Sequence, residues 1–88
     1  MYQNKNGEPL ELVLYKYDGC WFCRNVMVAI AEMQLNITVR DIHRDQGAME
    51  ELMKVGGKSQ VPCLFINGIA LYESKDIICF LETQVFDA

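Results

Sequence analysis

The stretch Leu10–Cys23, LELVLYKYDGCWFC, determines the fold that the sequence predicts. Its first part, Leu10–Tyr17, is apolar through the middle and rich in β-forming side chains, which is typical of a central strand covered on both faces. Asp18-Gly19 breaks this strand, and apolar side chains then recur at helical spacing, so we expect a helix that begins near Cys20. The buried stripe of this helix is expected to hold Cys23, Val26, Met27, Ile30 and Met33.

The segments after this helix predict an edge strand and a second helix. Asn36 is expected to stop the first helix. Ile37–Ile42 then alternates imperfectly between apolar and polar residues, which fits an exposed edge strand best. Asp45 is expected to cap a second helix that ends at Gly56-Gly57. The inward-facing residues of that helix would be Met49, Leu52 and Met53.

The last third of the chain predicts a hairpin followed by a helix. Asn67-Gly68 lies between the β-prone runs Pro62–Ile66 and Ile69–Leu71, and this arrangement favours a type I′ turn. Ser74 is expected to cap a final helix that has Asp76 in its first turn. The apolar residues of this helix are Ile77, Ile78 and Leu81. The order β-α-β-α-β-β-α predicts an α/β protein with a four-stranded mixed sheet flanked by helices.

The composition is that of one small folded domain. The chain has 88 residues, of which 51% are hydrophobic, so it is neither disordered nor large enough for two domains. Residues 1–9 are polar and are expected to form an N-terminal tail, with the domain over residues 10–88. The longest apolar run, Val26–Ala31, is far shorter than the roughly 20 residues of a membrane helix. The net charge of -4 and the scattered basic residues argue against nucleic acid as a partner.

The main chemical feature is the cysteine pair of Cys20-Trp21-Phe22-Cys23. At a helix start this spacing brings the two sulfurs within disulfide reach. Cys20 would lie where unpaired backbone N–H groups and the helix dipole favour a thiolate, which is the nucleophile in disulfide exchange. Cys23, one turn inside, would be shielded and able to resolve a mixed disulfide. The N-terminus shows no secretory signal, so we expect the reducing cytoplasm, where a close cysteine pair is more often catalytic or metal-binding than structural.

Different interpretations of the cysteines stay open at this point. Cys63 and Cys79 could complete a zinc site of four thiolates, although each lies in an apolar element where free cysteine usually fills the core. The pair could also be inert packing. His43, the only histidine, is expected at the surface. Trp21 and Phe22 either pack on a neighbouring loop or form a hydrophobic lip where substrates dock.

Three motifs in this order resemble the glutaredoxin family, in the branch shared with the N-terminal domain of glutathione S-transferases. The motifs are Leu14–Cys23, Gln60-Val61-Pro62 and Tyr72–Ile77. The likeness extends over nearly the whole chain, from about Leu10 to Phe86. The resemblance implies a thioredoxin-like fold and a cis peptide bond between Val61 and Pro62.

The resemblance also implies a binding site for glutathione. The backbone of Val61 would pair with the extended tripeptide, and Ser74 at a helix start would receive the γ-glutamyl carboxylate. Glu73 would suit the ammonium group, and Lys58, helped by Lys16, would suit the glycyl carboxylate. The complete predicted set is Lys16, Trp21, Phe22, Lys58, Gln60, Val61, Pro62, Glu73 and Ser74.

These observations predict a glutathione-dependent thiol–disulfide oxidoreductase. Cys20 would attack disulfide-containing or glutathionylated proteins, and Cys23 would resolve protein disulfides. Glutathione is the expected cosubstrate, and we expect a monomer that needs no metal and has no membrane or nucleic-acid partner. Cys63 directly follows Pro62, and we expect it near this site.

One departure from the family leaves the function less narrowly defined. Trp21 stands where the commonest motif has proline, which leaves the redox potential and the substrate set undetermined. Glutaredoxins without this proline sometimes hold an iron–sulfur cluster together with glutathione, so a cluster-binding glutaredoxin stays open. A transferase-like or purely glutathione-binding domain stays open too, as does a thioredoxin-like protein reduced by a flavoprotein.

Overall fold

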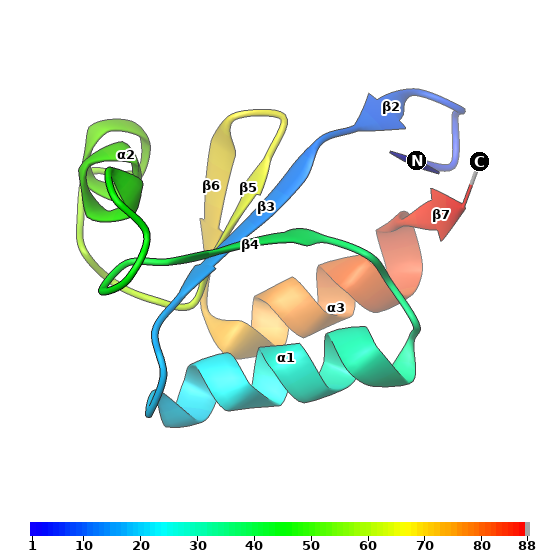
Figure 1. Ribbon diagram of the computed structural model, residues 1–88. Helices are drawn as coiled ribbons and strands as arrows, with labels where there is room; N and C mark the ends of the chain where they lie inside the picture. The colour runs from blue at the N-terminus through cyan, green and yellow to red at the C-terminus, as the bar shows by residue number, and fades with distance from the viewer. Residues whose placement is uncertain (88) are drawn as a thin grey trace.

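The computed structural model describes residues 1–87, which form a main sheet with helices on both faces (Figure 1). The main sheet has the strand order β4-β3-β5-β6, in which β3 and β4 are parallel and the other neighbours are antiparallel. The elements are β1 (Tyr2–Gln3), β2 (Pro9–Leu10), β3 (Leu12–Lys16), α1 (Trp21–Glu32), β4 (Thr38–Asp41), α2 (Ala48–Gly56), β5 (Cys63–Ile66), β6 (Ile69–Tyr72), α3 (Ser74–Gln84) and β7 (Phe86–Asp87). From β3 to α3 this order confirms the predicted mixed four-stranded sheet.

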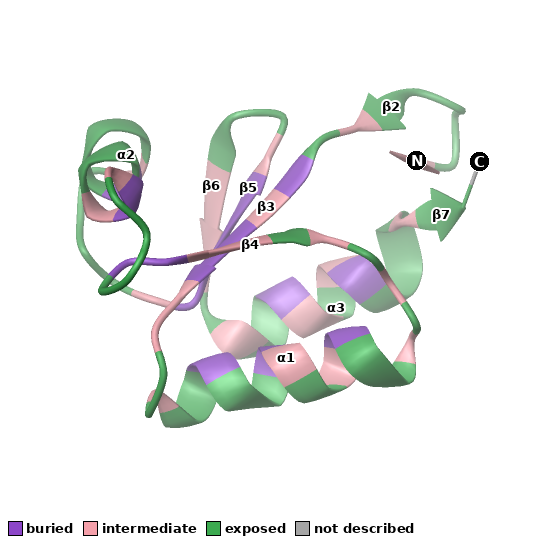
Figure 2. Ribbon diagram, in the orientation of Figure 1, coloured by how far each residue is buried: buried purple, intermediate pink, exposed green. Residues whose placement is uncertain are grey.

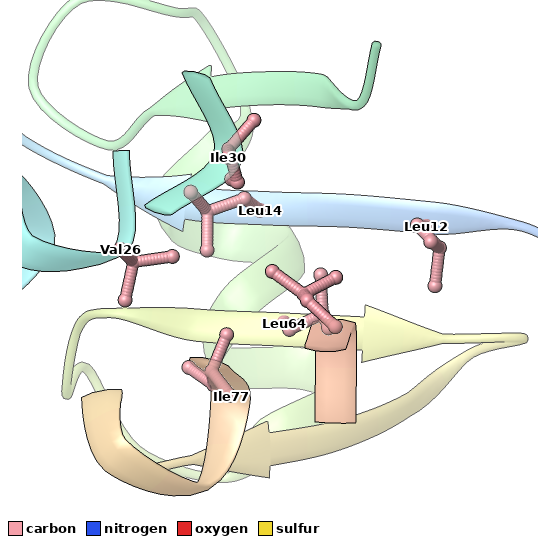
Figure 3. Packing of buried hydrophobic residues seen from close by; sticks show 7 residues of the cluster. Leu12, Leu14, Val26, Ile30, Leu64 and Ile77 are labelled. Carbon is pink, nitrogen blue, oxygen red and sulfur yellow. The ribbon is translucent and has the colours of Figure 1, made fainter. Parts of the chain in front are cut away.

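The sheet separates two hydrophobic clusters. The cluster under α1 and α3 is aliphatic and consists of Leu12, Leu14, Val26, Ile30, Leu64, Ile77 and Leu81 (Figure 3). The cluster under α2 consists of Tyr15, Ile42, Ala48, Leu52, Cys63 and Phe65. Side chains along a strand point alternately to opposite faces, so the central strands β3 and β5 contribute to both clusters. Figure 2 shows that β3 and β5 consist largely of buried residues. This confirms the prediction that β3 is covered on both sides.

Helix α1 begins where the sequence predicts and ends slightly earlier. Cys20 is its N-cap, and its last residue is Glu32. Asn36 as the stop is wrong, because Gln34 takes the left-handed conformation, with φ of 57°. The N–H group of Leu35 then donates back to the carbonyl of Ile30, which closes the helix end and turns Leu35 toward the aliphatic cluster.

Helix α2 differs from the prediction at its start. Gly47, in the left-handed conformation, is the N-cap, whereas the Asp45 carboxylate accepts the backbone N–H of Asp41 and does not cap the helix. The end at Gly56-Gly57 is confirmed. Leu52 is fully buried, but Met53 is 44% exposed and the prediction that it faces inward is wrong, since a helix of nine residues presents only one narrow face to the sheet.

The hairpin and the last helix follow the sequence closely. Asn67 and Gly68 have φ of 50° and 83°, as a type I′ turn between β5 and β6 requires. Helix α3 begins at Ser74, which is therefore its first residue and not its cap. Glu73 is the residue that precedes the helix, with φ of 72°, and its side chain makes no capping hydrogen bond.

The two ends of the chain meet in a second, small sheet. β1 pairs with β2 and with β7, so residues from the predicted N-terminal tail lie in strands against the C-terminal segment (Figure 1). The hydroxyl of Tyr2 also accepts the N–H of Asn36. The domain boundary at residue 10 stays a prediction. None of the helices formed by residues 1–87 has the length and apolar character needed to cross a membrane.

Candidate active site

Cys20 occupies the start of α1, with an extended backbone and a half-buried side chain. Its Sγ accepts the backbone N–H of Cys23 at 3.2 Å. No acidic residue lies in the first turn of the helix, so the dipole and the N–H groups act on the sulfur without a nearby carboxylate on the same turn. Trp21, unlike the proline of the commonest motif, has a backbone N–H group. Within residues 1–87, however, the hydrogen bond to the Cys20 sulfur comes from the N–H of Cys23 and none comes from Trp21.

Cys23 lies one turn further along and is 2% exposed. Burial is the largest cause that raises the pKa of its thiol, and the hydrogen bond with Cys20 raises it further. The backbone of Tyr17 and the ammonium of Lys16 act in the opposite direction but do not outweigh burial. Cys23 is therefore held as a neutral thiol beside Cys20, as the sequence predicts for a resolving cysteine.

A groove of about 420 Å³ gathers six of the predicted glutathione-binding residues. Its lining consists of Phe22, Gln60, Val61, Pro62, Glu73, Ser74 and Lys75. These residues come from the starts of α1, β5 and α3, which lie at one end of the molecule (Figure 1). Lys75 is the one lining residue that the sequence reasoning missed; its place directly after Glu73-Ser74 in the third motif was the available signal.

The groove exposes backbone groups that can bind an extended peptide. The Val61–Pro62 peptide bond is cis, as the family resemblance implies. Within residues 1–87, no hydrogen bond of the turns, loops or strands uses the N–H or C=O of Val61. The first helical bond of α3 runs from Ile77 N–H to Glu73 C=O, so the N–H groups of residues 74–76 are left for an anion.

Two residues of the groove, Gln60 and Glu73, are joined by a hydrogen bond between their side chains. The Nε2 of Gln60 donates to the Oε1 of Glu73 at 3.1 Å, which joins the two sides of the groove. Both residues are exposed, so this contact can exchange for one with a ligand. The positive φ of Glu73 directs the chain from β6 into α3 and places Ser74 at the open end of the helix.

Three predicted residues lie outside the groove. Trp21 is 68% exposed and lines neither of the hollows near the cysteines. The ammonium of Lys16 is paired with Asp18 at 2.9 Å and Asp41 at 3.5 Å, and it lines a second hollow of about 290 Å³ that also contains Cys20 and Cys23. The Nζ of Lys58 lies 4.3 Å from the ring centre of Tyr72. Their contacts with glutathione stay predictions.

The ion pairs around Lys16 stabilise the charged form of its ammonium group. The hydrogen bond to Asp18 is the main cause that raises the pKa of the Lys16 ammonium, and the same contact lowers the pKa of Asp18. Burial disfavours the charged form of Asp41, but the N–H of His43 and the ammonium of Lys16 outweigh it and lower the pKa of this carboxyl. Lys16 therefore stays positively charged near the cysteine pair.

The other two cysteines do not join the pair. Cys63 is fully buried in β5 on the α2 side of the sheet, and Cys79 is exposed on α3. In the part of the chain that the structure describes, no three His, Cys, Asp or Glu side chains gather as metal ligands. Cys63 and Cys79 therefore do not complete the four-thiolate cluster that the sequence left open.

A cysteine pair at a helix start, together with a cis-proline directly before β5 of a four-stranded mixed sheet, defines the class of thioredoxin-like proteins. Within this class, the glutaredoxin family profile matches residues 12–70, which is 59 of the 88 residues. The chain belongs to the glutaredoxin family. This membership associates it with glutathione-related thiol redox chemistry.

Solved structures with the same fold include both glutaredoxins and transferases. The holo form of glutaredoxin C1 from Populus tremula x tremuloides is 16% identical, with a TM-score of 0.64 over 82% of this chain and 74% of that one. Glutathione transferase Omega 3C from Trametes versicolor is 22% identical, with a TM-score of 0.70 over 84% and 33%. A delta-class glutathione transferase from Nilaparvata lugens is 29% identical, with a TM-score of 0.66 over 80% and 34%. The chain spans about a third of the length of these transferases.

Proposed function

We propose that this protein is a glutathione-dependent thiol–disulfide oxidoreductase. The observation that carries the proposal is the inequality of the two motif cysteines. Cys20 lies at the helix start with its sulfur accepting an N–H group, whereas Cys23 is buried and its pKa is raised. An accessible nucleophile beside a protected thiol is the arrangement that disulfide exchange needs.

The proposed reaction with a glutathionylated protein has two exchanges. The Cys20 thiolate attacks the sulfur of the bound glutathione, a disulfide forms between Cys20 and glutathione, and the protein thiol leaves and takes up a proton. A second glutathione thiolate then attacks this disulfide. Glutathione disulfide leaves and Cys20 returns as a thiolate. One free glutathione thiol is oxidised for each protein thiol released, and the other half of the glutathione disulfide comes from the substrate.

A protein disulfide requires Cys23 as well. After Cys20 forms a mixed disulfide with the substrate, Cys23 loses its proton and attacks the Cys20 sulfur, which releases the second substrate thiol. The resulting disulfide between Cys20 and Cys23 is reduced by two molecules of glutathione. The charged ammonium of Lys16 lies near Cys23 and favours the thiolate that this step requires.

We place glutathione in the groove lined by Phe22, Val61 and Ser74, with its sulfur directed toward Cys20 at the start of α1. Its backbone would pair with Val61, and its γ-glutamyl carboxylate would meet Ser74 and the N–H groups at the start of α3. Glu73 would exchange its bond with Gln60 for the ammonium group of the ligand. Phe22 and Pro62 supply the apolar side of the groove, and exposed Trp21 offers apolar surface to protein substrates. A monomer in the cytoplasm, supplied by its glutathione pool, fits this cycle.

The test is turnover of a glutathionylated peptide with glutathione as the only reductant, followed by NADPH consumption through glutathione reductase. We expect turnover that saturates with glutathione and a much slower rate when a flavoprotein thioredoxin reductase replaces glutathione. Turnover with that reductase, and none with glutathione, would contradict the proposal.

A transferase-like activity is the second candidate, favoured by the 29% identity to the delta-class transferase. It would conjugate glutathione to an electrophile without exchange at the cysteine pair. Conjugation of a chloronitrobenzene that is unchanged in Cys20→Ser, together with no turnover of the peptide disulfide, would select the transferase over the oxidoreductase.

A further inference from the structure

Tyr72 occupies a notch that exists only because residue 56 is glycine. A Cβ on Gly56 would lie 2.0 Å from the Tyr72 hydroxyl oxygen and 3.1 Å from Cζ of the ring. Gly56 is the last residue of α2 and its φ is not in the left-handed region, so the backbone itself does not require glycine there. The absence of a side chain makes room for the tyrosine ring.

The ring and the hydroxyl of Tyr72 both contact the same residue. The Nζ of Lys58 lies 4.3 Å above the ring centre, within the range of a cation–π interaction. The hydroxyl donates to the carbonyl oxygen of Lys58 at 3.4 Å, a long and therefore weak hydrogen bond. Tyr72 thus holds the side chain of Lys58 mainly through the face of its ring.

Tyr72 also links the two sides of the groove. It directly precedes Glu73 and Ser74, whereas Lys58 lies two residues before Gln60 on the opposite side. Two connections therefore cross between these sides: Tyr72 with Lys58, and Gln60 with Glu73. The first of them places a positive charge next to the segment that leads to Val61.

We propose that Tyr72 is a positioning residue that holds the Lys58 ammonium ready for the glycyl carboxylate of glutathione. The inference rests on the proposed function and adds to it the origin of selectivity for the complete tripeptide. An ammonium that rests on an aromatic face keeps N–H donors directed away from the ring, and those can bind a carboxylate. A lysine that is already ordered loses less conformational entropy when the ligand binds.

The experiment compares two thiols as reductants, glutathione and γ-glutamylcysteine, which lacks the glycine. We expect the wild type to have a lower KM for glutathione, and Tyr72→Phe, which keeps the ring, to retain this preference. Tyr72→Leu should reduce the preference by about two- to fivefold, the range of an exposed cation–π contact. The kcat with saturating thiol should change little.

Two further variants test the path through Lys58 and Gly56. Lys58→Met should lower the preference to the same extent, and adding Tyr72→Leu to it should have no further effect on the ratio of the two KM values. Gly56→Ala should displace the ring and act like Tyr72→Leu. Adding Tyr72→Phe to Gly56→Ala should restore part of the preference, because the shortest contact is with the hydroxyl.

The outcomes separate this inference from the function on which it rests. A wild type that turns over with glutathione, combined with an unchanged KM ratio in Tyr72→Leu and Lys58→Met, overturns the positioning role and leaves the oxidoreductase standing. An equal rise of both KM values in Tyr72→Leu also overturns it, since general damage does not distinguish the two thiols. A wild type without turnover overturns both. If Tyr72→Leu does not fold, Gly56→Ala, which displaces the Tyr72 ring, decides whether Tyr72 positions Lys58.

Discussion

The two faces of the sheet have different compositions and different tasks. Under α1 and α3 the core is aliphatic (Figure 3). Both helices begin at the groove. Under α2 the core contains Tyr15 and Cys63, and a polar contact joins helix to sheet: the hydroxyl of Tyr15 donates to Glu51 at 2.8 Å. Burial and this carboxylate raise the pKa of Tyr15 to about 12. In the proposed function, α1 and α3 carry the cysteine pair and the anion site, whereas α2 packs on the opposite face of the sheet.

The cysteines show the same division. Cys20 and Cys23 belong to α1, and the sulfur of Cys20 at the helix start accepts the N–H of Cys23. Cys63 is fully buried on the opposite face, without a helix start, and burial raises its pKa to about 11. Cys20 and Cys63 are thus expected to differ in reactivity.

The largest expected effect comes from replacing one cysteine on each face in separate variants. Cys20→Ser should reduce turnover of a glutathionylated peptide to the uncatalysed background, because no attacking thiolate remains. Cys63→Ala should keep close to the wild-type rate, since this buried neutral thiol takes no part. The measurement is the steady-state rate with glutathione as reductant. Loss of turnover in folded Cys63→Ala would break the division between the faces.

The second prediction removes one core side chain from each face. Leu52→Ala under α2 and Ile77→Ala under α3 should each lower the free energy of unfolding by about 2–5 kcal/mol, because both side chains are fully buried. Only Ile77→Ala should also raise the KM for glutathione, since Ile77 anchors the first turn of α3. Urea unfolding and glutathione titrations check this. A similar rise of KM in Leu52→Ala would contradict the comparison.

The third prediction concerns the start of α3. Replacing Glu73 and Ser74 together by alanine should raise the KM for glutathione, because hydrogen bonds to charged groups contribute about 1.5–3 kcal/mol each. One such contact corresponds to roughly a tenfold rise or more. Glu50→Ala, in the first turn of α2, is the matched control and should leave the KM unchanged. An unchanged glutathione dependence in the double variant would remove this end of the groove from the binding site.

The smallest effect is a loss of stability at alkaline pH that depends on Cys63. Its thiol pKa rises from the ordinary 9.0 to about 11 on folding, so between these values the unfolded chain releases a proton that the folded protein retains. The contribution of Cys63 to the free energy of unfolding is therefore fully present below pH 9. It falls as the pH rises toward 11, by on the order of 1–2 kcal/mol. Urea unfolding at pH 8 and 10.5 should show a smaller decrease in Cys63→Ala than in the wild type. Equal decreases would show that Cys63 does not titrate in this way.

The sequence predicts the parts of this molecule that local signals determine. Asn67-Gly68 strongly favours a tight hairpin turn, which the structure contains. The cysteine pair follows a strand and opens an apolar helical stripe, and this order predicts Cys20 at the helix start. The groove followed from the family motifs, because these motifs fall at the starts of α1, β5 and α3.

Features that depend on distant partners were not predictable in this way. The pairing of β1 with β7 joins two-residue strands from opposite ends of the chain, and neither has a pattern of its own. Gln34 and Glu73 adopt positive φ although glycine or asparagine is the usual signal. The partners of Lys16 and Lys58, namely Asp41 and Tyr72, lie on other elements, so spacing along the chain gives no indication of them.

The most direct test of the central claim is the identity of the cysteine that takes up glutathione. Cys23→Ser, combined with Cys79→Ser to remove the exposed thiol on α3, is incubated with glutathione disulfide and analysed by intact mass and peptide mapping. Without Cys23 to expel it, one glutathione per chain should remain bound, at Cys20, and adding Cys20→Ser should abolish the adduct. No adduct, or an adduct at Cys63, would contradict the account.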